Sequence, residues 1–290
     1  MTDAHRFEIR SGRYAAGGSR MGPKHAENED NFLIAEPEPA ALRVSHGDLY
    51  VVADGVGGHA KGEVASALAV EVVEAAYFNG THEDAVEQLV SAINAANVRV
   101  HESAILQPGQ GLGMATTIVA AAVLEEQIVV ANVGDSRAYV VGDGHIRQLS
   151  HDHSWVQDQL DSGKLTPEEA RTSTRRNIIT RALGLDSKVE TEVKTEAEDG
   201  SHTRLVLCSD GVHGVVDDEE LAELIEGLQP QAAVERVLAL VEERNGRDDA
   251  TLIVVELGTR VHVEEAEPPR QAGFFTSIFH IFRRRGRSAS

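Results

Sequence analysis

Short runs of apolar and β-branched residues recur along the chain, and most of them end at a Gly, Asp or Asn turn signal or at charged residues. Runs of this kind predict β-strands. The predicted strands cover residues 31–35, 49–53, 116–124, 127–134, 137–141, 204–209 and 251–257. The short "EEQ" and "GDG" segments that join successive runs favour antiparallel pairing.

Longer stretches carry apolar residues at the helical period instead. The predicted helices cover about 62–78, 83–105, 218–228 and 231–243. They come in pairs and do not alternate with the strands. This order favours an α+β fold with helices layered on antiparallel sheets over a doubly wound parallel sheet.

Two segments break this pattern. The polar, helix-prone stretch 150–183 lies between predicted strands, and we interpret it as a mobile flap with small helices of its own. An acidic, proline-containing linker at 260–273 precedes a Phe- and Arg-rich segment at 274–290. We therefore expect one domain over residues 1–259 that includes the flap.

Composition narrows the classes of function. With 41% apolar residues among 290, the chain can bury a sizeable core. A formal net charge of −20 argues against nucleic acid as a general partner, because phosphate-backbone binding depends on Lys and Arg. The single cysteine, Cys208, allows no internal disulfide and lies in an apolar strand, where it is expected to pack as a small hydrophobe. The sequence shows neither a signal-peptide pattern nor an apolar run of about 18 residues, so we expect a cytoplasmic location.

The candidate chemistry lies in carboxylates at strand ends or in facing loops. Each alone is typical of a turn or a helix cap. Packed strands would bring them to one edge, where unpaired negative charges are costly to bury and a divalent cation would balance them. Oxygen ligands suit Mg²⁺ or Mn²⁺, and the lack of a Cys/His cluster argues against zinc. The residues are Asp30, Asp54, Asp135, Asp210 and Asp248.

The stretch "VVADGVGGHAKGEVAS" places Asp54 at the end of a strand among glycines. Asp54 would offer a carboxylate to a metal, and Gly55 would offer a carbonyl that no side chain obstructs. Gly57 and Gly58 would let the backbone turn before the helix. Read alone, the same residues are typical of a plain strand–helix turn.

Several motifs occur together in one order: "ENEDNF", "VVADGVGGHAKGEVAS", "GMATTIVAAAV", "VANVGDSRAYVV", "LSHDHSW", "IITRALG", "LVLCSDGV" and "GRDDATLIVVEL". Between about Arg10 and Leu257 the chain thereby resembles the metal-dependent protein phosphatases (the PPM or type 2C family) in their compact bacterial form. The resemblance implies a four-layer α–β–β–α sandwich of two antiparallel sheets flanked by helix pairs. It also implies hydrolysis of phosphoserine and phosphothreonine in proteins by a water that Mn²⁺ or Mg²⁺ activates.

The resemblance implies roles for individual residues and two core metal ions, and it leaves a third ion open. Asp54 would bridge the core ions, and Asp30 would orient the attacking water. Beside Asp54, Gly55 would supply its carbonyl. The other implied ligands are Asp210 and Asp248 for the first ion, Glu29 for the second, and Asp135 with Asp210 for the third.

Three positions depart from the family pattern. His25 stands where an arginine usually clamps the substrate phosphate, so His25 or the neighbouring Lys24 would bind phosphate, with Arg20 as a further candidate. The alternative is that His25 is a solvated loop residue. Val56 replaces a proposed proton donor, which leaves the general acid unassigned. Asp249 replaces an asparagine and would either tighten metal binding or face solvent.

Other classes of function also fit parts of the pattern. An inactive binding module would have lost ligands, but Asp54, Asp210 and Asp248 are all present. A calcium-binding protein would need an EF-hand loop, which does not appear. A small-molecule phosphatase stays open. The expected partners are phosphorylated proteins and a Ser/Thr kinase that shares these substrates, and we expect a monomer.

The tail concentrates four of the seven phenylalanines in the last 17 residues, followed by an arginine cluster. The phenylalanines and two isoleucines recur at helical spacing and predict one apolar stripe. It would either pack on the acidic surface of its own domain or bring the protein to the inner face of an anionic membrane or to a partner. Residues 274–290 are too few to span a bilayer.

Overall fold

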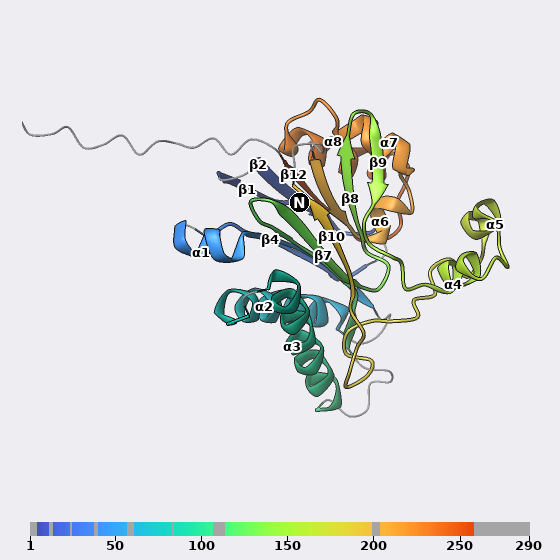
Figure 1. Cartoon of the computed structure of the whole chain (residues 1–290). Coiled ribbons are helices and arrows are strands. Elements are labelled where there is room, and N and C mark those ends of the chain that lie inside the picture. Colours follow the sequence, from blue (N-terminus) through green and yellow to red (C-terminus); the bar gives the residue numbers. More distant parts are fainter. Residues whose placement is uncertain are drawn as a thin grey trace, which may run out of the picture. The chain divides into compact units, whose positions relative to one another are not determined.

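Two antiparallel sheets form the centre of the fold (Figure 1). The computed structural model describes residues 5–11, 14–23, 25–37, 40–56, 61–82, 84–106, 114–198 and 204–257. The first sheet has the order β1 (His5–Ser11), β2 (Tyr14–Arg20), β12 (Ala250–Glu256), β11 (Arg204–Cys208), β8 (Arg137–Gly142), β9 (His145–Gln148). The second has the order β10 (Glu192–Ala197), β7 (Gln127–Val133), β6 (Ile118–Val123), β4 (Asp48–Val56), β3 (Asp30–Ala35), and the short β5 (Ala115–Thr116) also pairs with β4.

Helices cover the outer faces of both sheets. The pair α2 (Gly62–Asn79) and α3 (Ala85–Ile105) packs on the second sheet, and α7 (Asp218–Ile225) with α8 (Pro230–Glu243) packs on the first. A third apolar cluster fills the space between the sheets. Three buried clusters separate four layers, so the predicted α–β–β–α sandwich is confirmed. Two shorter helices are α1 (Ala40–His46) and α6 (Asp210–His213).

The sequences of the central strands are unbroken apolar runs because both faces of these strands are covered. Every residue of β6 is buried, since helices lie on one face of its sheet and the first sheet lies on the other. In α3 the buried positions Leu89, Ile93, Ala96 and Val100 recur at helical spacing, and the Asp84 side chain caps the helix by accepting from the N–H of Val86. The antiparallel pairing predicted at the "EEQ" and "GDG" turns is confirmed by the β6–β7 and β8–β9 pairs, although no strand was predicted over β9.

Several elements were not predicted, among them β1, β2, β10 and α1. Strand β10 lies at a sheet edge and is mostly exposed and charged, so it lacks an apolar run. Strand β2 consists largely of Ala and Gly. A Cβ on Gly17 would come within 2.5 Å of the Phe32 ring, so packing against β3 requires a residue that has no side chain.

The segment that we call the flap, residues 150–183, contains α4 (Trp155–Asp161) and α5 (Pro167–Thr172) and extends away from the sheets (Figure 1). Its two ends are joined to each other. The Trp155 N–H donates to the Ile178 carbonyl over 2.8 Å, and the Thr180 N–H donates to the His153 carbonyl over 2.8 Å. The small helices are as predicted, whereas movement of the flap stays a prediction.

The described residues all lie within one compact unit. The predicted linker and the Phe- and Arg-rich tail lie outside the described residues. Within the described part of the chain, no helix has the length and apolar character needed to cross a membrane.

Candidate functional site

The five aspartates predicted from strand ends gather at one edge of the sandwich. Asp30 and Asp54 are direct cross-strand partners in β3 and β4, so their side chains share one face of the sheet. The other three adjoin strands: Asp135 follows β7, Asp210 follows β11, and Asp248 precedes β12. In antiparallel sheets the carboxyl end of one strand lies beside the amino end of the next. The topology therefore brings together residues that lie far apart in the sequence.

The charges of these carboxylates act on one another. Burial raises the pKa of Asp54 well above its usual range, and the charges of Asp30, Asp210, Asp135 and Asp248 raise it further. Burial followed by neighbouring carboxylates likewise raises the pKa of Asp30 to about 7, of Asp135 to about 8 and of Asp210 to about 6. An interaction with the Asp54 side chain acts in the opposite direction and partly offsets the rise of the Asp210 pKa. A cation bound at this position would balance the accumulated negative charge.

Buried carboxylate oxygens without a partner also indicate that a cation would be stabilised here. Oδ1 of Asp30 and Oδ1 of Asp135 are buried without a hydrogen-bond partner. The other oxygen of Asp30 accepts from the Ser209 hydroxyl over 2.7 Å. As the side chains are placed, no three Asp, Glu, His or Cys groups in the described ranges enclose one point closely enough to hold an ion. The fit to hard divalent cations therefore rests on the unpaired oxygens and the accumulated negative charge.

Main-chain hydrogen bonds fix the end of β4. The Asp54 carbonyl accepts from the Thr117 N–H over 2.8 Å and from the Thr116 hydroxyl over 2.9 Å. The Asp54 N–H in turn donates to the Thr117 hydroxyl over 3.1 Å. Two adjacent threonines thus hold the backbone of Asp54, which limits where its carboxylate can lie.

Gly55 and the backbone of Glu29 lie in close contact. The Gly55 N–H donates to the Glu29 carbonyl over 3.1 Å, and the Ser66 hydroxyl of α2 donates to the same carbonyl over 2.6 Å. A Cβ on Gly55 would lie 2.4 Å from the backbone of Gly62. Glycine is therefore required by the approach of α2, in addition to the open carbonyl that the sequence suggested. Gly57 and Gly58 lie outside the described residues.

Asp249 is a buried anchor for the loop before β3. Its side chain is 3% exposed and accepts from the N–H groups of Gly22 and Glu29, each over 2.7 Å, and from Nδ1 of His25 over 2.9 Å. The expectation that Asp249 might face solvent is wrong, because three donors converge on its carboxylate. Asp249 instead positions the backbone of Glu29.

His25 is held by this anchor and is not a freely solvated residue. Burial lowers its pKa, but the hydrogen bond and charge of Asp249, with the charges of Asp248 and Glu29, outweigh that effect and leave the pKa raised. Nε2 of His25 lies 3.6 Å from Oδ1 of Asp248. Lys24, the other candidate for phosphate binding, lies outside the described residues.

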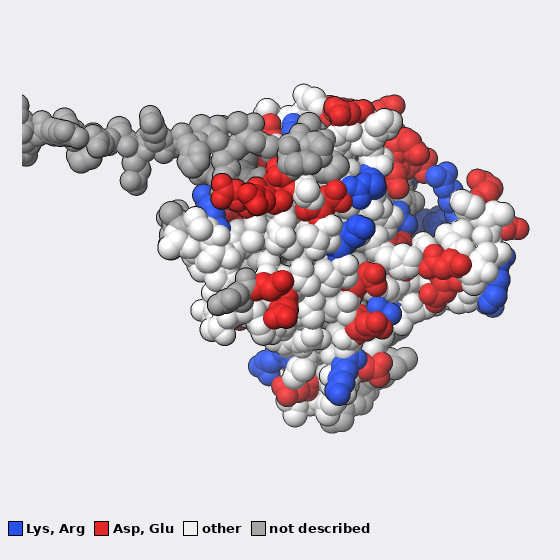
Figure 2. Space-filling model, in the orientation of Figure 1, with Lys and Arg blue, Asp and Glu red and all other residues white. Residues whose placement is uncertain are grey.

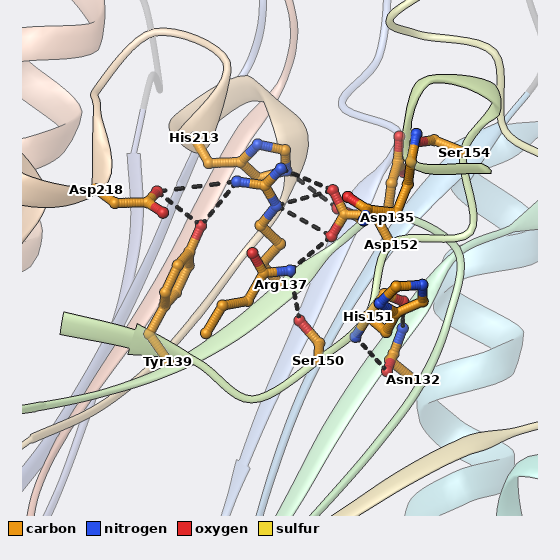
Figure 3. A network of polar contacts seen from close by, with 12 residues as sticks. Asn132, Asp135, Arg137, Tyr139, Ser150, His151, Asp152, Ser154, His213 and Asp218 are labelled. Carbon is orange, nitrogen blue, oxygen red and sulfur yellow. Dashed lines mark hydrogen bonds and ion pairs between the residues drawn. The ribbon is translucent and has the colours of Figure 1, made fainter. Parts of the chain in front are cut away.

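A buried ion pair beside Asp135 was missed in the sequence (Figure 3). Arg137 donates to Asp152 through Nε over 2.9 Å and through Nη2 over 2.7 Å, and it donates through Nη1 to the Tyr139 hydroxyl over 3.1 Å. That hydroxyl donates to Asp218 of α7 over 3.1 Å. The pair joins the strand that follows Asp135 to the first residues of the flap. An arginine at the start of an otherwise apolar strand was the available signal.

His213 supports Asp135 from the other side. Burial lowers the pKa of His213 to about 3, so the ring is neutral, and its Nε2 donates to the Asp135 carbonyl over 3.0 Å. Figure 3 shows Asp135 close to both His213 and the Arg137–Asp152 pair. The main chain of Asp135 is therefore fixed, while Oδ1 of its carboxylate stays unpaired.

A cleft of about 850 Å³ separates the flap from the rest of the unit. Asp135, Asp210 and Asp248 line it on one side, and residues between Ser154 and Asn177 line it on the other. The carboxylate edge is thus accessible to a ligand that enters beneath the flap.

Comparison with known proteins gives consistent matches. Residues 24–247 match the family model described as Protein phosphatase 2C. The serine/threonine phosphatase stp of Listeria monocytogenes serotype 4b is 34% identical over 235 residues, which cover 79% of this chain and 90% of the relative. The serine/threonine protein phosphatase PstP of Mycobacterium tuberculosis is 33% identical over 245 residues, which cover 84% of this chain and 45% of that protein.

Solved structures agree. The structure of the serine/threonine phosphatase Stp1 from Staphylococcus aureus superposes with a TM-score of 0.78 at 30% identity, covering 89% of this chain and all (100%) of that one. The catalytic domain of PstP in complex with two manganese ions superposes with a TM-score of 0.73 at 29% identity, covering 86% of this chain and 99% of that one.

Proposed function

The chain belongs to the protein phosphatase 2C family of metal-dependent hydrolases, and from this premise we propose that it removes phosphate from phosphoserine and phosphothreonine in proteins at a centre of two Mn²⁺ or Mg²⁺ ions. The observation that carries the proposal is the edge where five carboxylates meet, with buried unpaired oxygens, beside a cleft open to substrate. The relatives described above are themselves named serine/threonine phosphatases.

The residues that would hold the ions are the carboxylates of Asp54, Asp210, Asp248 and Glu29 and the Gly55 carbonyl. Asp135 would hold a third ion together with Asp210. Bound there, the ions would activate a water molecule for attack on phosphorus and offset the charge of the phosphoryl oxygens.

The chain's own groups would orient the reactants. Because Oδ2 of Asp30 accepts from Ser209, Oδ1 stays available to accept a hydrogen bond that orients the attacking water. Asp249 holds the His25 ring beside Asp248, where the ring can donate to a phosphoryl oxygen. Cys208 is fully buried and burial raises its pKa, so its thiol does not serve as a nucleophile. Val56 has no proton to give, and the general acid stays unassigned.

The biological role that follows is to oppose a Ser/Thr kinase by dephosphorylating that kinase and its substrates. Activity on small phosphate esters is the second candidate function, since the cleft alone does not exclude them. Turnover of phosphopeptides compared with free phosphate esters separates the two.

The direct test measures phosphate release from a phosphothreonine peptide with Mn²⁺ and with EDTA. Activity should be lost in EDTA, and Asp54→Asn should lower turnover by at least about a hundredfold because the site loses a bridging charge. Asp186→Asn removes the same charge from an exposed position and should match the unmodified protein. Full turnover in chelator, or in the Asp54 variant, would contradict the proposal.

A further inference from the structure

The flap side of the cleft carries two exposed arginines, Arg171 and Arg176. Within the described part of the chain, neither forms an ion pair, and Arg176 donates to the neighbouring Asn177 amide over 3.3 Å. Of the other arginines nearby, Arg247 is exposed and lines the cleft beside Asp248, whereas Arg244 and Arg175 are engaged. Arg244 makes a bidentate pair with Glu220 at 2.6 and 2.7 Å, and the guanidinium of Arg175 lies 4.9 Å from the centre of the Trp155 ring.

These two positive charges oppose the charge of the chain as a whole, whose formal net value is −20. Figure 2 shows Lys and Arg side chains bordering the hollow between the flap helices and the rest of the unit.

The opposite wall carries both signs of charge, and its acidic part lies at the start of α7. Asp217 and Asp218 at the start of α7 line the cleft there, and Asp218 is tied to Tyr139 and lies near Arg137. A peptide whose phosphate reaches Asp210 and Asp248 would therefore have a basic flap on one side and an acidic helix start on the other. Acidic side chains of the peptide would be attracted to the flap and repelled by α7.

We propose that Arg171 and Arg176 select phosphoproteins that carry Asp or Glu beside the phosphoserine or phosphothreonine to be hydrolysed. The proposal rests on the proposed function and adds a substrate class to it. Arginine suits this role because its planar guanidinium can bind a carboxylate through two hydrogen bonds.

The expected selectivity is moderate because both arginines are exposed. One exposed arginine–carboxylate pair changes affinity by about 1.4- to five-fold, so two pairs together give roughly two- to twenty-five-fold. The preference should weaken in high salt, since screening shortens the reach of surface charges.

The experiment compares three phosphothreonine peptides of equal length that differ only in flanking Glu, Gln or Lys, and it measures kcat/KM with saturating Mn²⁺. The unmodified protein should prefer Glu over Gln over Lys. The double variant Arg171→Glu/Arg176→Glu should reverse this order, and Arg171→Gln/Arg176→Gln should remove it. Lys164→Glu is the matched control, because Lys164 is an exposed flap residue that does not line the cleft, and it should keep the original order.

Equal kcat/KM for the three peptides, or an unchanged order in both double variants, would overturn the selectivity while leaving the proposed function intact. A reversal by Lys164→Glu as well would assign the effect to total charge and would also overturn it. Failure to hydrolyse any of the peptides would instead refute the proposed function and, with it, the selectivity.

Discussion

Replacing Asp249 by asparagine tests whether a single buried carboxylate positions the loop that carries Glu29. In the structure its two oxygens receive three donors: Gly22 N–H on Oδ1, and Glu29 N–H and His25 Nδ1 on Oδ2. An amide has only one acceptor oxygen. Whichever way the substituted side chain turns, its NH₂ group would face a backbone N–H that now lies 2.7 Å from an oxygen.

The magnitude follows from what is lost. A hydrogen bond to a charged group contributes about 1.5–3 kcal/mol, and a buried donor left unpaired costs about 1–3 kcal/mol. These two effects overlap, so we expect Asp249→Asn to lower the free energy of unfolding by about 2–4 kcal/mol. One effect acts in the opposite direction, because the charge of Asp249 repels Asp30 and Glu29. Bound cations would offset that repulsion, so the full loss should appear in Mn²⁺ and a smaller loss in EDTA.

The assay is urea unfolding followed by far-ultraviolet circular dichroism. The single tryptophan, Trp155, lies in the flap and would report on that segment instead of the sheets. Asp186→Asn is the control, since it removes one exposed carboxylate and should change stability by less than about 0.5 kcal/mol. If Asp249→Asn in Mn²⁺ also stays within about 0.5 kcal/mol of the unmodified protein, the anchoring role is refuted.

Three further predictions follow from other parts of the chain. Gly55→Ala should destabilise the fold by several kcal/mol in thermal unfolding, because its Cβ would lie 2.4 Å from the Gly62 backbone; an unchanged melting temperature would show that α2 moves aside freely. Burial lowers the pKa of His153 from 6.5 to about 4. Between these pH values the folded protein therefore binds fewer protons than the unfolded chain. The stability that this residue contributes is present above about pH 6.5 and is lost as the pH falls towards 4. His153→Gln should therefore reduce the pH dependence of the unfolding free energy in that window, and equal slopes for both proteins would exclude this contribution. Deleting residues 270–290 should leave peptide turnover intact and abolish sedimentation with anionic liposomes, whereas loss of turnover would assign the tail to the fold.

The sequence predicted those elements whose burial produces a local pattern of apolar residues. Strands β4, β6 and β7 are covered on both faces, and this produces the apolar runs that identified them. Helices α2, α3, α7 and α8 begin and end within about three residues of the predicted limits. Edge strand β10 has no such apolar run because most of its side chains are exposed.

The candidate site was predictable in its residue types but not in its partners. A carboxylate at a strand end can be recognised locally, as for Asp54 and Asp210. The role of Asp249 could not, because its donors Gly22 and Glu29 lie 227 and 220 positions away. The Arg137–Asp152 pair shows the same limit at shorter range, since nothing in either segment specifies the other.

The flap leaves the sandwich and returns to it at neighbouring points, where His153 and Trp155 pair with Thr180 and Ile178. A segment whose two ends already lie side by side can change in length or be replaced at little entropic cost, because closing the loop depends only weakly on the number of residues within it. The flap can therefore be exchanged as one segment without changing the sandwich. Under the proposed selectivity, peptide choice can diverge among relatives, or be re-engineered, through residues 156–177, while the strands that place the carboxylates keep their sequence.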